Sequence, residues 1–207
     1  MTHAFSAADK EDALREVINL GMGAAGAALA ETLGVFVRLS VPNLEAIDGR
    51  DVVPLLAAAR WGTRSVSVSR QAFYGGLSGE ALVLFDDTGC RHLADLLGHE
   101  GDTSGNLAEE VLLELGNAMV GACINGIADR LKEVVSFAPP ALVCDGAPLW
   151  QAFSTSSFTG RRTLLVCIDF SIEERQFESR IAIFISEKSL ARLDTAVEAF
   201  LTELMDG

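Results

Sequence analysis

The strongest constraint on the fold is that the chain repeats itself. When residues 11–42 are shifted by 98 positions, ten identities appear among the paired residues. The pairs are Glu11/Glu109, Leu14/Leu112, Glu16/Glu114, Asn19/Asn117, Gly23/Gly121, Ala24/Ala122, Ala30/Ala128, Leu33/Leu131, Val37/Val135 and Pro42/Pro140. Further on, residues 80–93 match residues 180–193 in their apolar pattern at a shift of 100. Such self-similarity indicates one αβ unit present twice, so we predict an internally duplicated, pseudo-twofold domain.

Local patterns give each half the same order of elements. Ser6 and Asp9 form a capping-box pattern before a helix that runs to about Leu33. Strands are expected at 35–42, 64–69 and 79–86, and the alternation of polar and apolar residues over 64–69 is that of a half-buried strand. A short helix is expected at 88–98 and a polar connector at 98–106. The second half repeats this with a helix at 106–132, strands at 134–140, 161–172 and 179–186, and a final helix at 187–204. The predicted class is α+β, with long helices on a mainly antiparallel sheet, in one domain (1–207) of two repeats (about 6–98 and 104–204).

Composition narrows the function classes. The formal net charge of −13 argues against nucleic-acid binding, which depends on Lys and Arg at phosphates. No run of about 18 uncharged apolar residues exists, so we expect no membrane span. The start, MTHAFSAADKED, has no basic and apolar signal region. The four cysteines form no C-x-x-C pair and no cluster with metal-ligand spacing, which favours free thiols in a cytoplasmic protein without a metal of its own.

Three polar residues of the first helix are expected to share one exposed face. At about 100° per residue, Asp12, Glu16 and Asn19 fall within a narrow arc, and the apolar residues between them fall on the opposite side. Small residues continue the same strip towards the end of the helix, at Gly23, Gly26, Ala27 and Ala30. We therefore expect a flat face against which another macromolecule can lie. The Glu/Asn pair recurs in the second half, and Asn is a mediocre residue for a helix interior, so its retention in both halves needs a reason.

The spacing of these residues carries a family resemblance. The first half reads Asp12-x3-Glu16-x2-Asn19-x22-Pro42, and the second reads Glu110-x3-Glu114-x2-Asn117-x22-Pro140. The chain resembles the CheC/CheX/FliY family of chemotaxis phosphatases, whose motif is (Asp or Ser)-x3-Glu-x2-Asn-x22-Pro. Glu110 departs from the first motif position. Within the family the length favours a CheC-like chain, because CheX is shorter and FliY carries a further flagellar switch domain.

The resemblance implies an activity: hydrolysis of the aspartyl phosphate of a CheY-type response regulator. It implies that Asn19 and Asn117 position the attacking water, and that Glu16 and Glu114 pair with a lysine of the regulator. Asp12 and Glu110 would support from the preceding turn, while Pro42 and Pro140 fix the strand beside each helix. The Mg²⁺ of the reaction belongs to the regulator, so no cofactor is expected on this chain. The receptor deamidase CheD is a second candidate partner that the resemblance names.

Three alternatives stay open at this stage. The string Gly21-Met-Gly23-Ala-Ala-Gly26 matches a dinucleotide-binding pattern, but that fingerprint should follow a strand and open a helix, whereas here it lies within one. A family member that binds a response regulator or CheD without catalysis is the second alternative. A Ser/His or Cys/His hydrolase is the third, although only His3, His92 and His99 are available and no G-x-S-x-G elbow is present.

Overall fold

The structure is a computed structural model, which describes residues 5–48, 51, 55, 61, 65–86, 105–153, 162–172 and 177–206. The helices are α1 (Ala7–Leu33), α4 (Gly105–Arg130) and α5 (Glu187–Asp206), with a short 3₁₀ helix η1 (Leu149–Phe153). The strands are β1 (Arg38–Leu39), β2 (Asn43–Asp48), β3 (Ser65–Gly75), β4 (Gly79–Asp86), β5 (Val135–Phe137), β6 (Ala141–Pro148), β7 (Arg162–Ile172) and β8 (Phe177–Ser186). The short helix expected at 88–98 and most of the connector that follows it lie outside the described residues.

The first helix begins where the capping box predicts. The Ser6 hydroxyl accepts the backbone N–H of Asp9, and the Asp9 carboxylate accepts the backbone N–H of Ser6 at 2.9 Å. Two of the amide groups that a helix start leaves unpaired are thereby satisfied. The helix ends at Gly34, which takes the left-handed conformation (φ 66°) that glycine adopts without steric cost. The prediction of this helix is confirmed at both ends.

The eight strands form one antiparallel sheet with the order β1-β7-β8-β4-β3-β5. At its centre β4 and β8 run side by side, with Leu82 opposite Ala182. Strands β1 and β2 of the first half pair in succession with β7 of the second, while β5 and β6 of the second half pair in the same way with β3 of the first. The predicted α+β class with an antiparallel sheet is confirmed. That both halves descend from one copied unit stays a prediction.

The two strands expected after the long helices are shorter than predicted, and the one expected over 134–140 covers only Val135–Phe137. The strand expected over 35–42 is paired only at Arg38 and Leu39, because the chain leaves α1 through Gly34 and reaches β7 late. The strands β2 and β6 were not predicted. Neither strand alternates polar and apolar residues along its whole length, and both are ordered by their pairing with β7 and β3. The intrinsic strand propensity of a short segment predicts its structure poorly, because pairing with a neighbouring strand has the larger effect.

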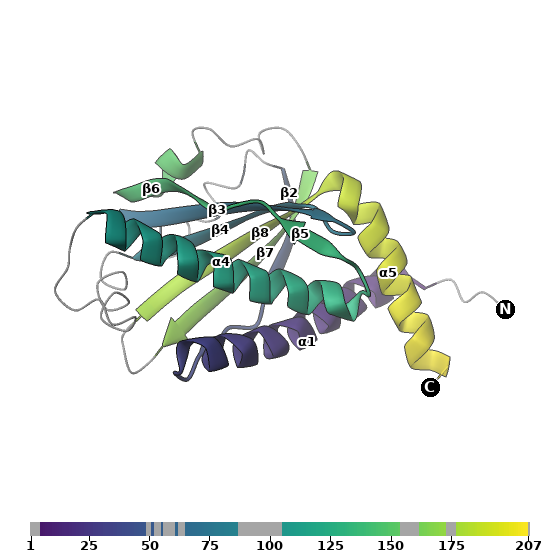
Figure 1. Ribbon diagram of the computed structural model, residues 1–207. Helices are drawn as coiled ribbons and strands as arrows, with labels where there is room; N and C mark the ends of the chain where they lie inside the picture. Colours follow the sequence, from purple (N-terminus) through teal and green to yellow (C-terminus); the bar gives the residue numbers. More distant parts are fainter. Residues whose placement is uncertain are drawn as a thin grey trace.

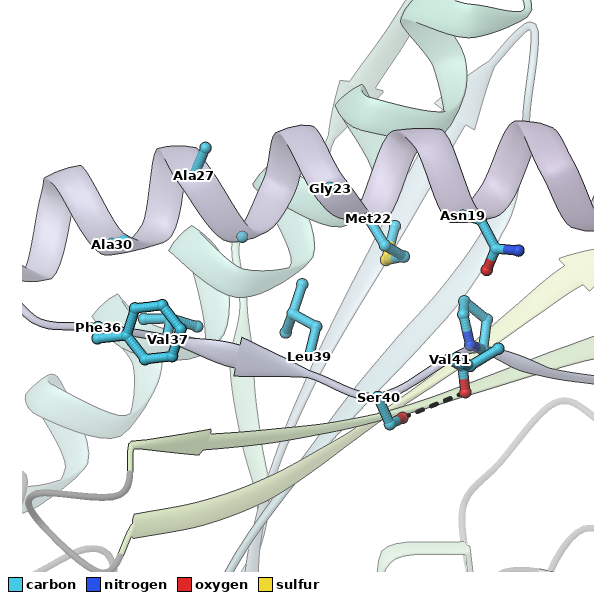
Figure 2. Close-up of a pocket in the computed structure, with 12 residues that line it drawn as sticks. Asn19, Met22, Gly23, Ala27, Ala30, Phe36, Val37, Leu39, Ser40 and Val41 are labelled. Carbon is cyan, nitrogen blue, oxygen red and sulfur yellow. Dashed lines mark hydrogen bonds between the residues drawn. The ribbon is translucent and has the colours of Figure 1, made fainter.

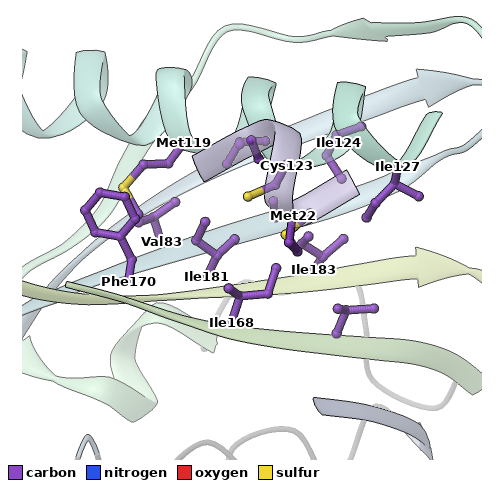
Figure 3. Packing of buried hydrophobic residues seen from close by; sticks show 14 of the residues in the cluster. Met22, Val83, Met119, Cys123, Ile124, Ile127, Ile168, Phe170, Ile181 and Ile183 are labelled. Atoms are coloured by element: carbon purple, nitrogen blue, oxygen red, sulfur yellow. The ribbon is translucent and has the colours of Figure 1, made fainter. Parts of the chain in front are cut away.

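Helices α1 and α4 lie along the same face of the sheet, and α5 crosses the end at which the chain begins and finishes (Figure 1). The main core fills the space between these helices and the sheet. Figure 3 shows Met22, Met119 and Cys123 of the helices above Ile168 and Ile181 of the sheet. A second, smaller apolar cluster covers the opposite face of the sheet, around Trp61, Leu84 and Phe184. The central strands are therefore buried on both faces.

Burial on both faces corrects the expectation for residues 64–69. Their alternation of Val and Ser suggested a strand with one wet face. In the structure Ser67 and Ser69 are each only 3% exposed, and α4 covers β3 at Ser69. A Cβ built on Gly116 would lie 2.4 Å from the Ser69 hydroxyl, so the helix rests almost directly on the strand. A small polar side chain is what this close approach leaves room for.

Helices α1 and α4 cross at a pair of glycines. A Cβ built on Gly21 would lie 2.7 Å from the backbone carbon and oxygen of Gly126. A Cβ built on Gly126 would lie 2.4 Å from the backbone oxygen of Gly21. No other residue fits at either position without moving a helix, so these two glycines set the distance between the helices that carry the two motifs.

The second motif lies on an unusually apolar helix. Glu109–Arg130 is the stretch among the described helices that is long and apolar enough to cross a membrane, with a mean hydropathy of 1.5. Of this window, 56% is buried inside the structure, where α4 packs against both the sheet and α1. The high hydropathy of α4 is explained by this packing, because two sides of the helix are buried, one against the sheet and one against α1.

Candidate functional site

The polar face of α1 is exposed as its spacing predicts. Asp12, Glu16 and Asn19 are all solvent-exposed, whereas Val17 and Ile18 are fully buried against the sheet. A helix rotates about 100° per residue, so burial of the apolar side turns the three polar residues outward together.

Asn19 stands at one end of a groove of about 520 Å³. One wall is the small-residue strip of α1, and the other is the segment 36–42, which includes the buried Pro42. Figure 2 shows the Asn19 side chain directed towards Val41 on the opposite wall. Asn19 and Pro42, which are 23 positions apart in the motif, therefore share one surface feature.

The groove corrects the expectation of a flat face. Gly23 is open, with no atom within 4 Å of a built Cβ, but Gly26 lies 3.5 Å from the Leu39 side chain by the same measure. Ala30 is half-buried. The chain turns back after Gly34 and covers the far part of the strip, so the open part is the region next to Asn19.

The wall opposite Asn19 is fixed to the sheet through Ser40. The Ser40 N–H donates to the Asp169 carbonyl at 2.8 Å, and the Asp169 N–H donates to the Ser40 hydroxyl at 2.9 Å. Asp169 in turn accepts two hydrogen bonds from the Arg180 guanidinium, at 2.8 and 2.9 Å. Bidentate pairs of this kind hold their geometry well. The position of Pro42 relative to α1 therefore follows from the sheet.

The polar residues of the second motif are exposed like those of the first, but the second asparagine has a different support. Glu110, Glu114 and Asn117 are exposed on α4, and Pro140 is half-buried. The side-chain amide of Asn117 is held by a strand of the sheet, because Gln71 Nε2 on β3 donates a hydrogen bond to Asn117 Oδ1 at 2.7 Å. Sequence reasoning missed Gln71. The signal that could have found it is a polar residue in β3 where the matching strand of the other half, β7, carries apolar residues.

The glutamates of both motifs, Glu16 and Glu114, are exposed. Within the described ranges, neither Glu16 nor Glu114 takes part in an ion pair. Arg15, which lies between Asp12 and Glu16, is paired with Glu11 at 2.8 Å. A chain with a net charge of −13 thus presents two exposed and uncompensated carboxylates, one beside each asparagine. Such carboxylates suit contact with a cationic group of a partner.

The remaining chemical groups offer no competing site among the described residues. No group of three or more His, Cys, Asp or Glu side chains there could hold a metal ion. Cys123 and Cys144 are buried free thiols, and Cys167 is half-buried. His3, His92, His99 and Cys90 lie outside the described residues, so the hydrolase alternative is not tested. The glycines of the G-x-G-x-x-G string lie inside α1, where Gly21 serves the crossing with α4.

No family model matches the chain. A curated protein of Halobacterium salinarum named "Putative CheY-P phosphatase CheC1" is 26% identical over 134 residues. The match covers 63% of this chain and 66% of that protein, so the chain spans just under two thirds of this curated relative.

Solved structures share the fold over nearly the whole chain. FliY of Thermotoga maritima superposes with a TM-score of 0.65 at 18% identity, covering 97% of this chain and 99% of that one. A chain of the CheX-CheY-BeF3-Mg+2 complex from Borrelia burgdorferi superposes with a TM-score of 0.54 at 20% identity, covering 82% of this chain and 97% of that one. The resemblance to the CheC/CheX/FliY family is confirmed. Identities this low establish the shared fold of the chain, and its activity has to be argued from the site.

Proposed function

We propose that this protein is a phosphatase that hydrolyses the aspartyl phosphate of a CheY-type response regulator. The observation that carries the proposal is the exposed Glu/Asn pair with its distant proline, present once on α1 and once on α4. A solvated helix face explains one such pair but gives no reason for the same pair to recur at the same spacing in both halves. The name of the curated relative, which refers to CheY-P, supports the same reading.

In this proposal each asparagine positions water. Hydrolysis of an aspartyl phosphate needs a water molecule in line with the leaving carboxylate oxygen, and its transition state is loose. Positioning therefore contributes more than proton abstraction. An amide suits this role because it can donate one hydrogen bond and accept another. Asn19 and Asn117 are exposed, so each can enter the active site of a docked regulator.

Glu16 and Glu114 then act one turn earlier on each helix. Each carboxylate is exposed and, among the described residues, free of an ion pair, so it can pair with a lysine of the regulator and orient the docked helix. Asp12 and Glu110 support from the preceding turn. In this proposal Pro42 supports the wall that faces Asn19, and Pro140 has the matching role for Asn117. The Mg²⁺ of the reaction is carried by the regulator in this mechanism.

The test is dephosphorylation of candidate response regulators by the purified chain. We expect Asn19→Ala and Asn117→Ala to lower the rate of their own site by about 10²–10³, the loss seen when one positioned polar group is removed from a reaction centre. The double variant should lose most of the activity. Asn125→Ala is the matched control, because Asn125 is an exposed asparagine of α4 outside the motif. Circular dichroism confirms that each variant is folded.

Two outcomes would replace this proposal. Turnover that is unchanged in the double variant would remove both asparagines from the mechanism. Binding of a phosphorylated regulator without any turnover by the wild-type chain would favour a non-catalytic interaction module.

Binding of CheD and a cytoplasmic location are further predictions. A pull-down with purified CheD tests the first, and cell fractionation tests the second.

A further inference from the structure

The strand residues at the equivalent position differ between the two halves, and only one of them can form a hydrogen bond with a motif asparagine. Leu39 pairs with Phe170 on one side of the sheet as Phe137 pairs with Phe73 on the other. Two residues before each phenylalanine, β7 carries Ile168 and β3 carries Gln71. Ile168 is fully buried in the apolar core, and Gln71 is only 3% exposed. The position beneath the helix is thus apolar in one half and an amide in the other.

The surroundings of Gln71 decide which way its amide points. Gln71 Nε2 lies 2.9 Å from the Ala138 carbonyl oxygen and 2.7 Å from Asn117 Oδ1. A carbonyl oxygen can only accept, so the atom of Gln71 that faces Ala138 has to be its nitrogen. The same nitrogen faces Asn117, which therefore has to present its oxygen inward. The amide nitrogen of Asn117 is left to project outward as a donor.

This arrangement persists although it leaves Gln71 incompletely paired. Gln71 Oε1 is buried and has no hydrogen-bond partner within the described part of the chain. A buried carbonyl oxygen without a partner is unfavourable for folding, and an apolar residue there would avoid it, as Ile168 does on the other side. A polar residue kept at a cost to stability is expected where it serves a site.

We propose that Gln71 is a positioning residue that locks the Asn117 amide with its nitrogen outward, so that the α4 site is pre-oriented and the α1 site is not. In the described structure the Asn19 side chain has no hydrogen-bond partner, so its amide is free to rotate. The proposal rests on the proposed phosphatase function and makes the two motifs unequal. The α4 site turns over faster, even though its first motif residue is Glu110.

The kinetic test uses an Asn19→Ala chain, in which only the α4 site operates. Adding Gln71→Leu should lower kcat by about 10-fold through loss of orientation. KM should stay the same, because Glu114 and the docking face are untouched. Ser69→Ala is the matched control, a buried polar residue on the same face of β3 that, among the described residues, forms no hydrogen bond with Asn117. In a chain that already carries Asn117→Ala, Gln71→Leu should cause no further loss. An unchanged kcat, or an equal loss with and without Asn117, would overturn the proposal.

A second measurement does not depend on activity. Side-chain ¹⁵N relaxation should report a more ordered amide for Asn117 than for Asn19 in the wild-type protein, and Gln71→Leu should remove the difference. Equal order in the wild type, or a difference that survives the substitution, would contradict the lock even if no regulator is turned over. If Gln71→Leu fails to fold, Gln71→Ile copies the residue of the matching position. Absence of turnover in the wild type would refute the phosphatase while these spectra still decide on Gln71.

Discussion

The glycine string in α1 offers a quantitative test of how the helices pack. Gly21 and Gly23 are two residues apart in the same helix, but they face different surroundings. Gly21 is buried at the crossing with α4, where a Cβ would meet the Gly126 backbone at 2.7 Å. Gly23 is exposed, and a Cβ there would meet nothing within 4 Å. We compare Gly21→Ala with Gly23→Ala.

Two contributions determine how each substitution changes the free energy of unfolding relative to the wild type. Alanine in place of glycine in a helix interior stabilises by about 1 kcal/mol, and both variants gain it. Carbon atoms in contact lie about 3.5–4.0 Å apart, so Gly21→Ala forces the helices apart by roughly 1 Å. Overpacking of this kind costs about 1–3 kcal/mol. Gly23→Ala should therefore gain about 1 kcal/mol, and Gly21→Ala should fall below it by about 1–3 kcal/mol.

The assay is urea unfolding followed by circular dichroism, with Gly121→Ala as a second open control from the other half. The slope of the transition should be the same in all variants, because the surface exposed on unfolding does not change. If Gly21→Ala stabilises the protein as much as Gly23→Ala does, the close crossing is wrong. The G-x-G-x-x-G string would then need another explanation.

Three further predictions concern the start of α1 and Cys123. Ser6→Ala removes the cap of α1 and should lower the free energy of unfolding by about 1 kcal/mol in urea titrations. Hydrogen bonds from Ser6 hold the pKa of Asp9 below its usual range, so the Asp9 carboxylate stabilises the fold above its ordinary pKa of about 3.9, and this contribution disappears as the pH falls through the lowered value. Asp9→Asn should flatten the acid side of the stability profile, and an unchanged profile would contradict this. Burial raises the pKa of Cys123 to about 12, so iodoacetamide at pH 8 should label it only after denaturation, as peptide mass spectrometry can check; labelling of the native protein would refute its burial.

The sequence alone was sufficient for features that depend on short-range spacing. The capping box at Ser6 and the exposed face of Asp12, Glu16 and Asn19 follow from the geometry of one helix, whatever it packs against. The recurrence of the Glu/Asn pair at a shift of 98 needed no structure either. The central strand β4 was predicted at its observed ends because its apolar run is bounded by turn residues.

The burial of individual strand residues and the shape of the surface beside the motif depend on tertiary contacts, which sequence spacing does not predict. No local pattern states that Ser69 is buried, because that depends on Gly116 of a helix 47 positions later in the chain coming down onto β3. The groove beside Asn19 exists because segment 36–42 is held to β7 through Ser40.

The hydrogen bond that supports Asn117 is the clearest example of a feature that only the tertiary structure determines. Asn19 and Asn117 look alike in the sequence, since each follows a glutamate by three positions and precedes a proline by 23. The strand of the opposite half supplies Gln71 to Asn117, whereas at the equivalent register position the other half carries the apolar Ile168. A hydrogen bond between residues 46 positions apart depends on how strands cross between the halves, and only the folded chain determines that.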